Sequence, residues 1–277
     1  ARHRPFAMVF WSRDPDGTQH NQGDSLNRLT PGINGPTTFA AIRNADGDLA
    51  KLRTALKRLG LDRTTDIIVT SDHGFSTISK QSDTSRAART RYADVPEGFL
   101  PPGFLALDLA SALNMPAFDP EAGNAPVTTG AHPSRGNALL GADPSHPDIV
   151  VAANGGSDLL YLPGRDPTLA RRIVTALLDQ DYISGIFVDD RLGSIAGTLP
   201  LSSINLKGAA LPPVPSIVVI FRSATTGCAI PTNCQVEVAD TTLQQGQGMH
   251  GSFGRGDKFN FAGGVDRFGA TQRRIGW

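Results

Sequence analysis

The sequence predicts an α/β fold, in which helices cover a parallel or mixed sheet. Three observations support this fold class. Residues 6–11 form a run that is apolar on both faces, as in an inner strand of a covered sheet. An amphipathic helical pattern follows, and residues 66–70 then form a short strand rich in β-branched residues. A helix between two strands is the usual order in α/β domains.

The clearest helix is predicted from Thr37, a candidate cap after Pro36, to the residue before Gly60. Its apolar residues recur at spacings of three and four, which predicts one stripe packed against a sheet: Ile42, Ala45, Leu49, Leu52, Leu56 and Leu59. Further helices are expected at 104–113 and 167–178. Strands are expected at 148–153 and 158–162, paired through a turn at 154–157, and at 185–188, 216–221 and about 259–262.

The length allows one large α/β domain or two small ones. Because no repeat or linker clearly divides the chain, we predict a single α/β domain over residues 1–277. The 30 glycines and 20 prolines indicate many loops, and the balance of 26 basic and 26 acidic residues gives no basic patch for a nucleic-acid scaffold. No apolar run approaches the roughly 18 residues that span a bilayer. Because a natural protein seldom opens on its core strand, we expect the domain to be incomplete at its N-terminus. Trp277 follows the last strand closely, so we expect the C-terminus to be incomplete as well.

Two cysteines, Cys228 and Cys234, lie close together in one loop. In an exported protein they would form a local disulfide, and in the cytosol they would be two free thiols. We favour the disulfide, because closely spaced cysteine pairs in loops persist as bonds in oxidising compartments. This favours a periplasmic or secreted location.

Carboxylate and imidazole side chains gather in three short segments: 14–20 with Asp16 and His20, 71–74 with Asp72 and His73, and 248–251 with His250. Carboxylate and imidazole are the groups that bind zinc, manganese or iron at open catalytic sites. Two of the segments follow predicted strands, where open α/β sheets place their ligands. Two metal ions about 4 Å apart would clamp a phosphoryl group during in-line displacement. The segments therefore predict a two-metal phosphoester hydrolase.

The residues of these segments can also be interpreted without a metal site. Asp14 competes with Asp16 for the carboxylate role, and Asp16-Gly17 could be a simple turn with His20 on the surface. Pro15 and Gly17 favour a loop over a helix for this segment. Asp72 could cap a turn beside a solvent-facing His73, although a bend at Gly74 would let both side chains reach one site.

The three segments, in this order and at these separations, resemble the metal-binding segments of the alkaline phosphatase superfamily, in its type I phosphodiesterase/nucleotide pyrophosphatase branch. Residues 10–16, 154–158 and 250–255 are also similar to bacterial members of that branch. The resemblance implies a three-layer sandwich with a mostly parallel central sheet and helices on both faces. It also implies two divalent metal ions, with zinc expected and manganese or iron as alternatives. One would be held by Asp16, His20 and His250, and the other by Asp72 and His73.

In that family the second metal ion also takes an Asp and a Thr or Ser nucleophile from an earlier segment, which these 277 residues do not contain. The resemblance therefore implies that they bind metal but do not complete the reaction alone. The missing segment could be a separate chain, and the substrate would be a small phosphodiester or nucleotide. A phosphomonoesterase, phosphonate hydrolase or sulfatase-like enzyme, and a non-catalytic metal-binding domain, are the alternatives. Aromatic and basic neighbours of the segments could contact substrate, although core packing is favoured for the aromatic residues and solvation for the arginines: Trp11, Phe75, Phe253, Arg13 and Arg255.

Overall fold

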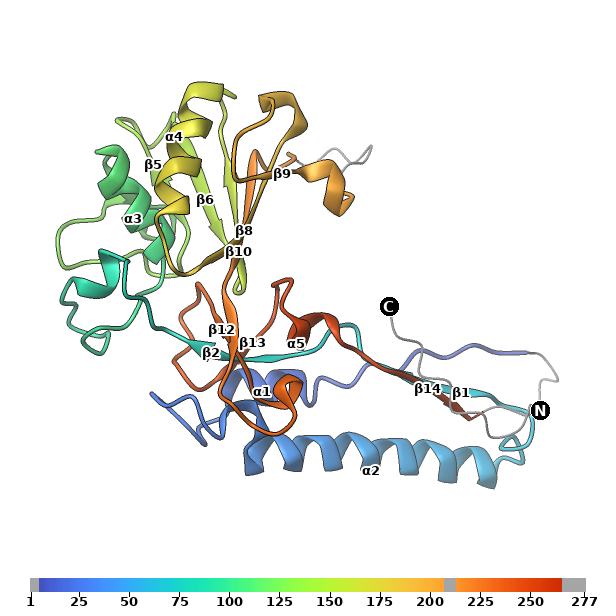
Figure 1. Ribbon diagram of the computed structural model, residues 1–277. Helices are drawn as coiled ribbons and strands as arrows, with labels where there is room; N and C mark the ends of the chain where they lie inside the picture. The colour runs from blue at the N-terminus through green and yellow to red at the C-terminus, as the bar shows by residue number, and fades with distance from the viewer. Residues whose placement is uncertain (1–4, 207–212, 266–277) are drawn as a thin grey trace.

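The computed structural model describes residues 5–206 and 213–265. The expectation of an incomplete C-terminus rested on Trp277, which lies outside these residues. The described chain forms a body built on two sheets and an arm that projects from it (Figure 1). Among the described residues, no helix combines the length and the apolar character that crossing a membrane requires.

The larger sheet has eight strands in the order β4-β3-β5-β6-β7-β10-β8-β9. Their bounds are β3 Ala117–Asp119, β4 Ala125–Pro126, β5 Ala138–Leu140, β6 Ile149–Ala153, β7 Ser157–Tyr161, β8 Ile183–Val188, β9 Leu199–Pro200 and β10 Ile217–Phe221. Only the β8–β9 pair is parallel, so the prediction of a mostly parallel sheet is wrong. Short turns join several neighbouring strands, as the predicted hairpin of β6 and β7 does, and such turns allow only antiparallel pairing.

Helices α3 (Phe104–Leu113) and α4 (Pro167–Leu178) lie where the sequence predicts them. Their buried residues belong to the same core cluster as Leu160, Ile217 and Val219 of the sheet. Phe187, Val218 and Ile220 alternate along the strands with residues of that cluster, so their side chains lie on the opposite face of the sheet. There they form a smaller cluster with the short 3-10 helix η5 (Leu201–Ile204). Both helices therefore cover one face, and the prediction of a sandwich with helices on both faces is wrong for the described residues.

The smaller sheet carries the candidate site. It has four strands in the order β11-β12-β2-β13, with bounds β2 Ser76–Ser79, β11 Ser223–Thr225, β12 Gln235–Val238 and β13 Gly248–Met249. Strand β2 is parallel to β12 and antiparallel to β13, and all its residues are buried. An isolated bridge between Gly155 and Asp240 links this sheet to the β6–β7 turn of the larger one.

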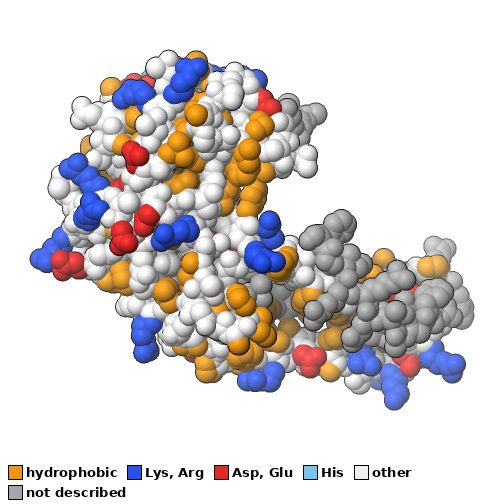
Figure 2. All heavy atoms as spheres, viewed as in Figure 1, with side chains coloured by type: hydrophobic (Ala, Val, Ile, Leu, Met, Phe, Trp, Pro, Cys, Tyr) orange, Lys and Arg blue, Asp and Glu red, His pale blue; other side chains and the backbone are white. Residues whose placement is uncertain are grey.

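The arm consists of helix α2 (Pro36–Arg58) and a ribbon of β1 (Ile67–Thr70) and β14 (Ala262–Val265) (Figure 1). The space-filling view shows the arm projecting from the body (Figure 2). Residues 6–11 are an exposed extended segment instead of the predicted buried strand, because no described strand pairs with them; Val9 is 95% exposed. Helix α2 lies close to its predicted bounds, but its stripe is not packed on a sheet, and Ile42 is 46% exposed.

The remaining helical segments are short. They are α1 (Asp16–Asn21), α5 (Arg255–Lys258) and the 3-10 helices η1 Gly32–Asn34, η2 Ala87–Arg89, η3 Pro120–Ala122, η4 Asp190–Leu192 and η6 Pro231–Cys234. The loop around η6 is closed by a disulfide between Cys228 and Cys234, in agreement with the pairing favoured from the sequence.

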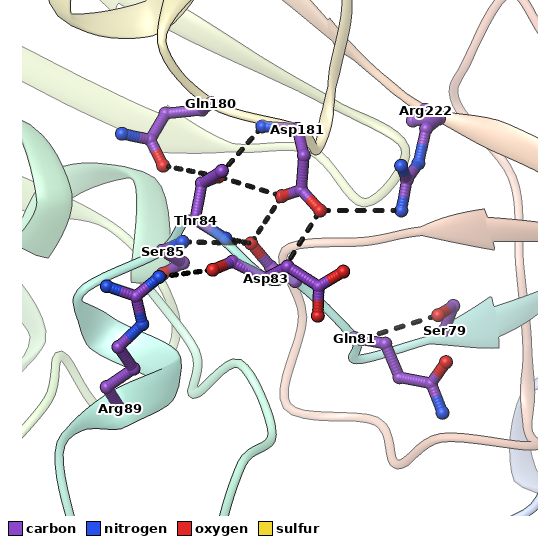
Figure 3. Close-up of polar contacts among 10 residues, drawn as sticks. Ser79, Gln81, Asp83, Thr84, Ser85, Arg89, Gln180, Asp181 and Arg222 are labelled. Atoms are coloured by element: carbon purple, nitrogen blue, oxygen red, sulfur yellow. Dashed lines mark hydrogen bonds and ion pairs between the residues drawn. The ribbon is translucent and has the colours of Figure 1, made fainter.

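A half-buried aspartate joins the segment after β2 to the larger sheet. The Asp181 carboxylate accepts hydrogen bonds from Thr84 Oγ1 (2.9 Å) and Asp83 N–H (3.0 Å), as Figure 3 shows, and another from Ser82 Oγ (2.5 Å). Arg222 Nη2 lies 3.7 Å away. Burial alone would raise the pKa of Asp181, but these donors outweigh it and lower the pKa. Asp181 therefore ties the chain that leaves the smaller sheet to the start of β8.

Replacing Asp181 with Ala should lower the free energy of unfolding by about 1–2 kcal/mol, because three donors lose a charged acceptor. Urea denaturation followed by circular dichroism measures this change. Asp179→Ala is the matched control: Asp179 is exposed at the end of α4, and its removal should change stability by less than about 0.5 kcal/mol. Equal effects of the two substitutions would show that Asp181 does not join these segments.

Candidate metal centre

The first ligand pair lies on a helix instead of the predicted loop. Asp16 begins α1, and His20 follows one turn later, so the two side chains share one helical face. Asp16 Oδ1 lies 3.5 Å from His20 Nε2. The spacing of four residues therefore brings a carboxylate and an imidazole together directly.

Asp14, the competing carboxylate, has another role. Its Oδ1 accepts a hydrogen bond from Thr18 Oγ1 (2.5 Å) and its Oδ2 accepts one from Asn44 of α2 (3.0 Å). The hydrogen bond from Thr18, followed by the one from Asn44, lowers the pKa of Asp14. Asp14 thus holds α1 against α2, and Asp16 is the carboxylate that faces the histidines.

The other two segments converge on the same carboxylate oxygen. His73 Nε2 lies 3.8 Å from Asp16 Oδ1, and His250 Nε2 lies 3.7 Å from it. The rings of His73 and His250 stack with their centroids 3.7 Å apart. Three segments far apart in the sequence therefore meet at one point, as their ligand residues predict.

A close backbone contact holds the loop of His73 in place. Gly74 N–H donates to the Asp257 carbonyl oxygen at 2.7 Å, and a Cβ on Gly74 would lie only 1.8 Å from the Gly256 carbonyl oxygen. No residue other than glycine fits this contact without moving backbone. Glycine is therefore required at position 74, where the sequence predicts a bend, because only glycine lets the two loops of the site pack this closely.

Two backbone carbonyls set the orientation of the imidazoles. His20 Nδ1 lies 2.9 Å from the Gly248 carbonyl oxygen, and His73 Nδ1 lies 2.8 Å from the Gly74 carbonyl oxygen. A carbonyl only accepts, so each Nδ1 carries the proton and each Nε2 keeps its lone pair. Both lone pairs belong to the nitrogens nearest Asp16, and a carbonyl partner on the other nitrogen is usual for metal-binding histidines.

Phe75 packs against all three histidines, with ring centroids 4.8 Å from His20, 5.9 Å from His73 and 5.4 Å from His250. From the sequence, Phe75 could be either a core residue or a residue that stacks on substrate. In the structure its ring forms the apolar wall of the site. The other candidate contacts lie elsewhere: Phe253 packs on Phe187 at 5.5 Å, and the Arg255 guanidinium lies 5.3 Å from the Phe259 ring. Trp11 is 72% exposed.

The donor atoms fit a metal ion. One atom each from Asp16, His20 and His250 lie within 4.8 Å of one another. Asp16 Oδ1 is buried and has no hydrogen-bond donor among the described residues, although buried carboxylate oxygens ordinarily have one. Asp72 approaches from the solvent side: its side chain is 74% exposed and its Oδ1 lies 3.8 Å from His73 Nε2. One carboxylate and two imidazoles suit zinc with an open position.

The site disfavours protonated histidine. Burial, and then the neighbouring His73 and His20, lower the pKa of His250 to about 4, from the usual 6.5, and outweigh the attraction of Asp16 and Asp72. His250 is therefore a neutral donor with a free lone pair at physiological pH.

This pKa predicts how the stability of the metal-free protein depends on pH. Between pH 6.5 and 4 the unfolded chain protonates His250 and the folded chain does not, so the free energy of unfolding should fall as pH falls through this range. His250→Asn should reduce the slope. Urea denaturation with a chelator present, at several pH values, measures both proteins, and identical slopes would contradict the shift.

Residues 1–122 match the family model described as type I phosphodiesterase / nucleotide pyrophosphatase. This match agrees with the resemblance recognised from the motifs. It covers Asp16, His20, Asp72 and His73, and it ends before His250. No curated protein and no solved structure matches the chain.

Proposed function

Because residues 1–122 carry the sequence of the type I phosphodiesterase / nucleotide pyrophosphatase family, we propose that this chain forms the metal centre of a phosphodiesterase or nucleotide pyrophosphatase. Its substrate is a small phosphodiester or nucleotide. The cofactors are two divalent metal ions, zinc in our proposal, with manganese and iron as the alternatives. The convergence of three distant segments on Asp16 Oδ1 carries this proposal.

The residues divide into two ligand sets. Asp16, His20 and His250 are the set for one ion, which is supported by the close grouping of their donor atoms. Asp72 and His73 are the set for the other, where exposure of Asp72 leaves room for substrate and for ligands from another segment. Bound divalent ions would stabilise charge on phosphoryl oxygens and lower the pKa of a coordinated hydroxyl.

The protein's own groups hold this arrangement before any ligand binds. The Gly248 and Gly74 carbonyls keep the protons of His20 and His73 on Nδ1, so each Nε2 lone pair is available. The Phe75 ring covers one side of the imidazoles and limits the access of water there. The prediction that a Thr or Ser nucleophile comes from outside these 277 residues stays a prediction.

The proposal extends to location. The Cys228–Cys234 disulfide supports a periplasmic or secreted protein, because such bonds persist in oxidising compartments. Cell fractionation with an antibody against the chain tests this point.

The function is tested by assaying the zinc-loaded protein, in a form that includes the predicted nucleophile segment, with bis-p-nitrophenyl phosphate and with p-nitrophenyl phosphate. We expect preference for the diester, loss of turnover with a chelator and loss of turnover in Asp16→Asn. Preference for the monoester would instead support a phosphomonoesterase, and hydrolysis of phosphonate or sulfate esters would support those branches of the superfamily. Zinc binding without turnover in the intact protein would indicate a non-catalytic metal-binding domain.

A further inference from the structure

Two buried carboxyl groups lie directly behind the candidate metal centre. Glu237 is on β12 and Asp257 is on α5, and they are 1% and 4% exposed. Among the described residues, no ion pair joins either carboxyl group to a basic side chain. Burial of two carboxylates without a cation is costly, so their arrangement needs another explanation.

Asp257 contacts both histidine-bearing loops. Its Oδ2 accepts from Ser252 N–H at 2.9 Å, two residues after His250, and its backbone carbonyl accepts from Gly74 N–H at 2.7 Å, next to His73. Its Oδ1 accepts from Ser76 Oγ at 2.7 Å. Both carboxylate oxygens therefore receive a proton from a donor, which is the pattern of an ionised group.

Glu237 has the complementary pattern. Its Oε2 accepts from Ser252 Oγ, whereas its Oε1 is buried and has no donor among the described residues. Both carboxyl groups therefore contact Ser252: Glu237 through the hydroxyl group and Asp257 through the backbone N–H.

The space for this pair depends on the turn between β6 and β7. A Cβ on Gly156 would lie 2.2 Å from Glu237 Oε1 and 2.7 Å from the Cβ of Ser252. Gly156 N–H also donates to the His250 carbonyl oxygen at 3.2 Å. The turn therefore closes over the pair and reaches the third ligand segment.

We propose that Glu237 and Asp257 are positioning residues: Glu237 holds the Ser252 hydroxyl group, and Asp257 joins Ser252 to Ser76, so that together they clamp the loops of His73 and His250 in one arrangement. The effect on metal binding rests on the function proposed above, whereas the clamp itself does not. Burial, then the charge of Asp257, raises the pKa of Glu237 well above its usual value. Burial also raises the pKa of Asp257, against the lowering effect of its Ser252 and Ser76 donors.

The test compares an isosteric amide with a truncation. In Glu237→Gln the amide oxygen can still accept from Ser252 Oγ, so this variant should resemble the wild type. In Asp257→Ala both Ser252 N–H and Ser76 Oγ lose their acceptor, so the clamp should be lost. Amide hydrogen exchange of the metal-free protein reports on the loops directly, and zinc titration calorimetry reports on the metal centre.

We expect exchange at 72–74 and at 250–254 to be about tenfold faster or more in Asp257→Ala and unchanged in Glu237→Gln. Zinc affinity should fall about 10- to 100-fold only in Asp257→Ala. Equal behaviour of the two variants, or faster exchange in one loop alone, would overturn the clamp. If Asp257→Ala fails to fold, Ser76→Ala decides: it removes one donor to Asp257, and unchanged exchange at 72–74 would overturn the clamp. A wild-type protein that binds no zinc would overturn the proposed function, while the exchange result would still decide the clamp.

Discussion

Replacing Asp16 with Asn should lower the zinc affinity of the protein about 100-fold or more, equivalent to about 2.7 kcal/mol or more of binding free energy. Asp16 Oδ1 lies close to the Nε2 atoms of His20, His73 and His250, so the substitution removes the shared anionic ligand. The fold should be retained, because Asp16 Oδ1 has no hydrogen-bond donor to lose among the described residues. Isothermal titration calorimetry and thermal denaturation measure the two quantities.

Asp14→Asn is the matched control, two residues away. Asp14 accepts from Thr18 and Asn44 and does not face the histidines, so its substitution should cost about 1 kcal/mol of stability and leave zinc affinity within about threefold of the wild type. Loss of zinc binding in Asp14→Asn with retention in Asp16→Asn would reverse the assignment of the two carboxylates.

Gly74→Ala should have the largest effect on the fold of the site. The new methyl group would lie 1.8 Å from the Gly256 carbonyl oxygen, and a backbone neighbour cannot rotate away. We expect a loss of about 3 kcal/mol of stability, as in overpacked cores, together with zinc affinity reduced at least about tenfold as the loops of His73 and His250 separate. Urea denaturation and zinc titration calorimetry measure the two losses.

Gly47→Ala provides the control for this substitution. Gly47 lies within α2, and a methyl group added there would have no atom within 4 Å, so alanine should stabilise the helix by about 1 kcal/mol and leave zinc affinity unchanged. Unchanged stability and zinc affinity in Gly74→Ala would show that the two loops are not packed as described.

The sequence was most informative where the signal is local. The stripe of α2, the apolar pattern of α3, the proline at the start of α4 and the β6–β7 turn all predict elements that the structure contains. Periodicity and capping act within one element, so they can be recognised without knowledge of the rest of the fold.

Pairing and burial could not be recognised in the same way. Residues 6–11 have the composition of a buried strand, yet a strand needs neighbours, and no described strand pairs with them. Sheet direction depends on which strands meet, and the local patterns of β6, β7 and β10 do not specify it. The parallel sheet expected from the resemblance was wrong for this reason.

The candidate site shows the same division. Residue type and neighbouring glycines are local features, and they singled out the three histidines and two aspartates that the structure brings close together. Phe75, Glu237 and Asp257 act only through contacts between distant segments, and no sequence signal distinguishes them from ordinary core residues.

Residues 14–20, 71–74 and 248–251 must form one metal centre for the proposed function to hold. Anomalous X-ray diffraction from crystals of the zinc-loaded protein measures this directly. We predict one zinc peak coordinated by Asp16, His20 and His250, and a second peak beside it at Asp72 and His73. A protein that binds no zinc, or zinc located only at a surface pair such as His132 with Asp94 or His146 with Asp143, would contradict it.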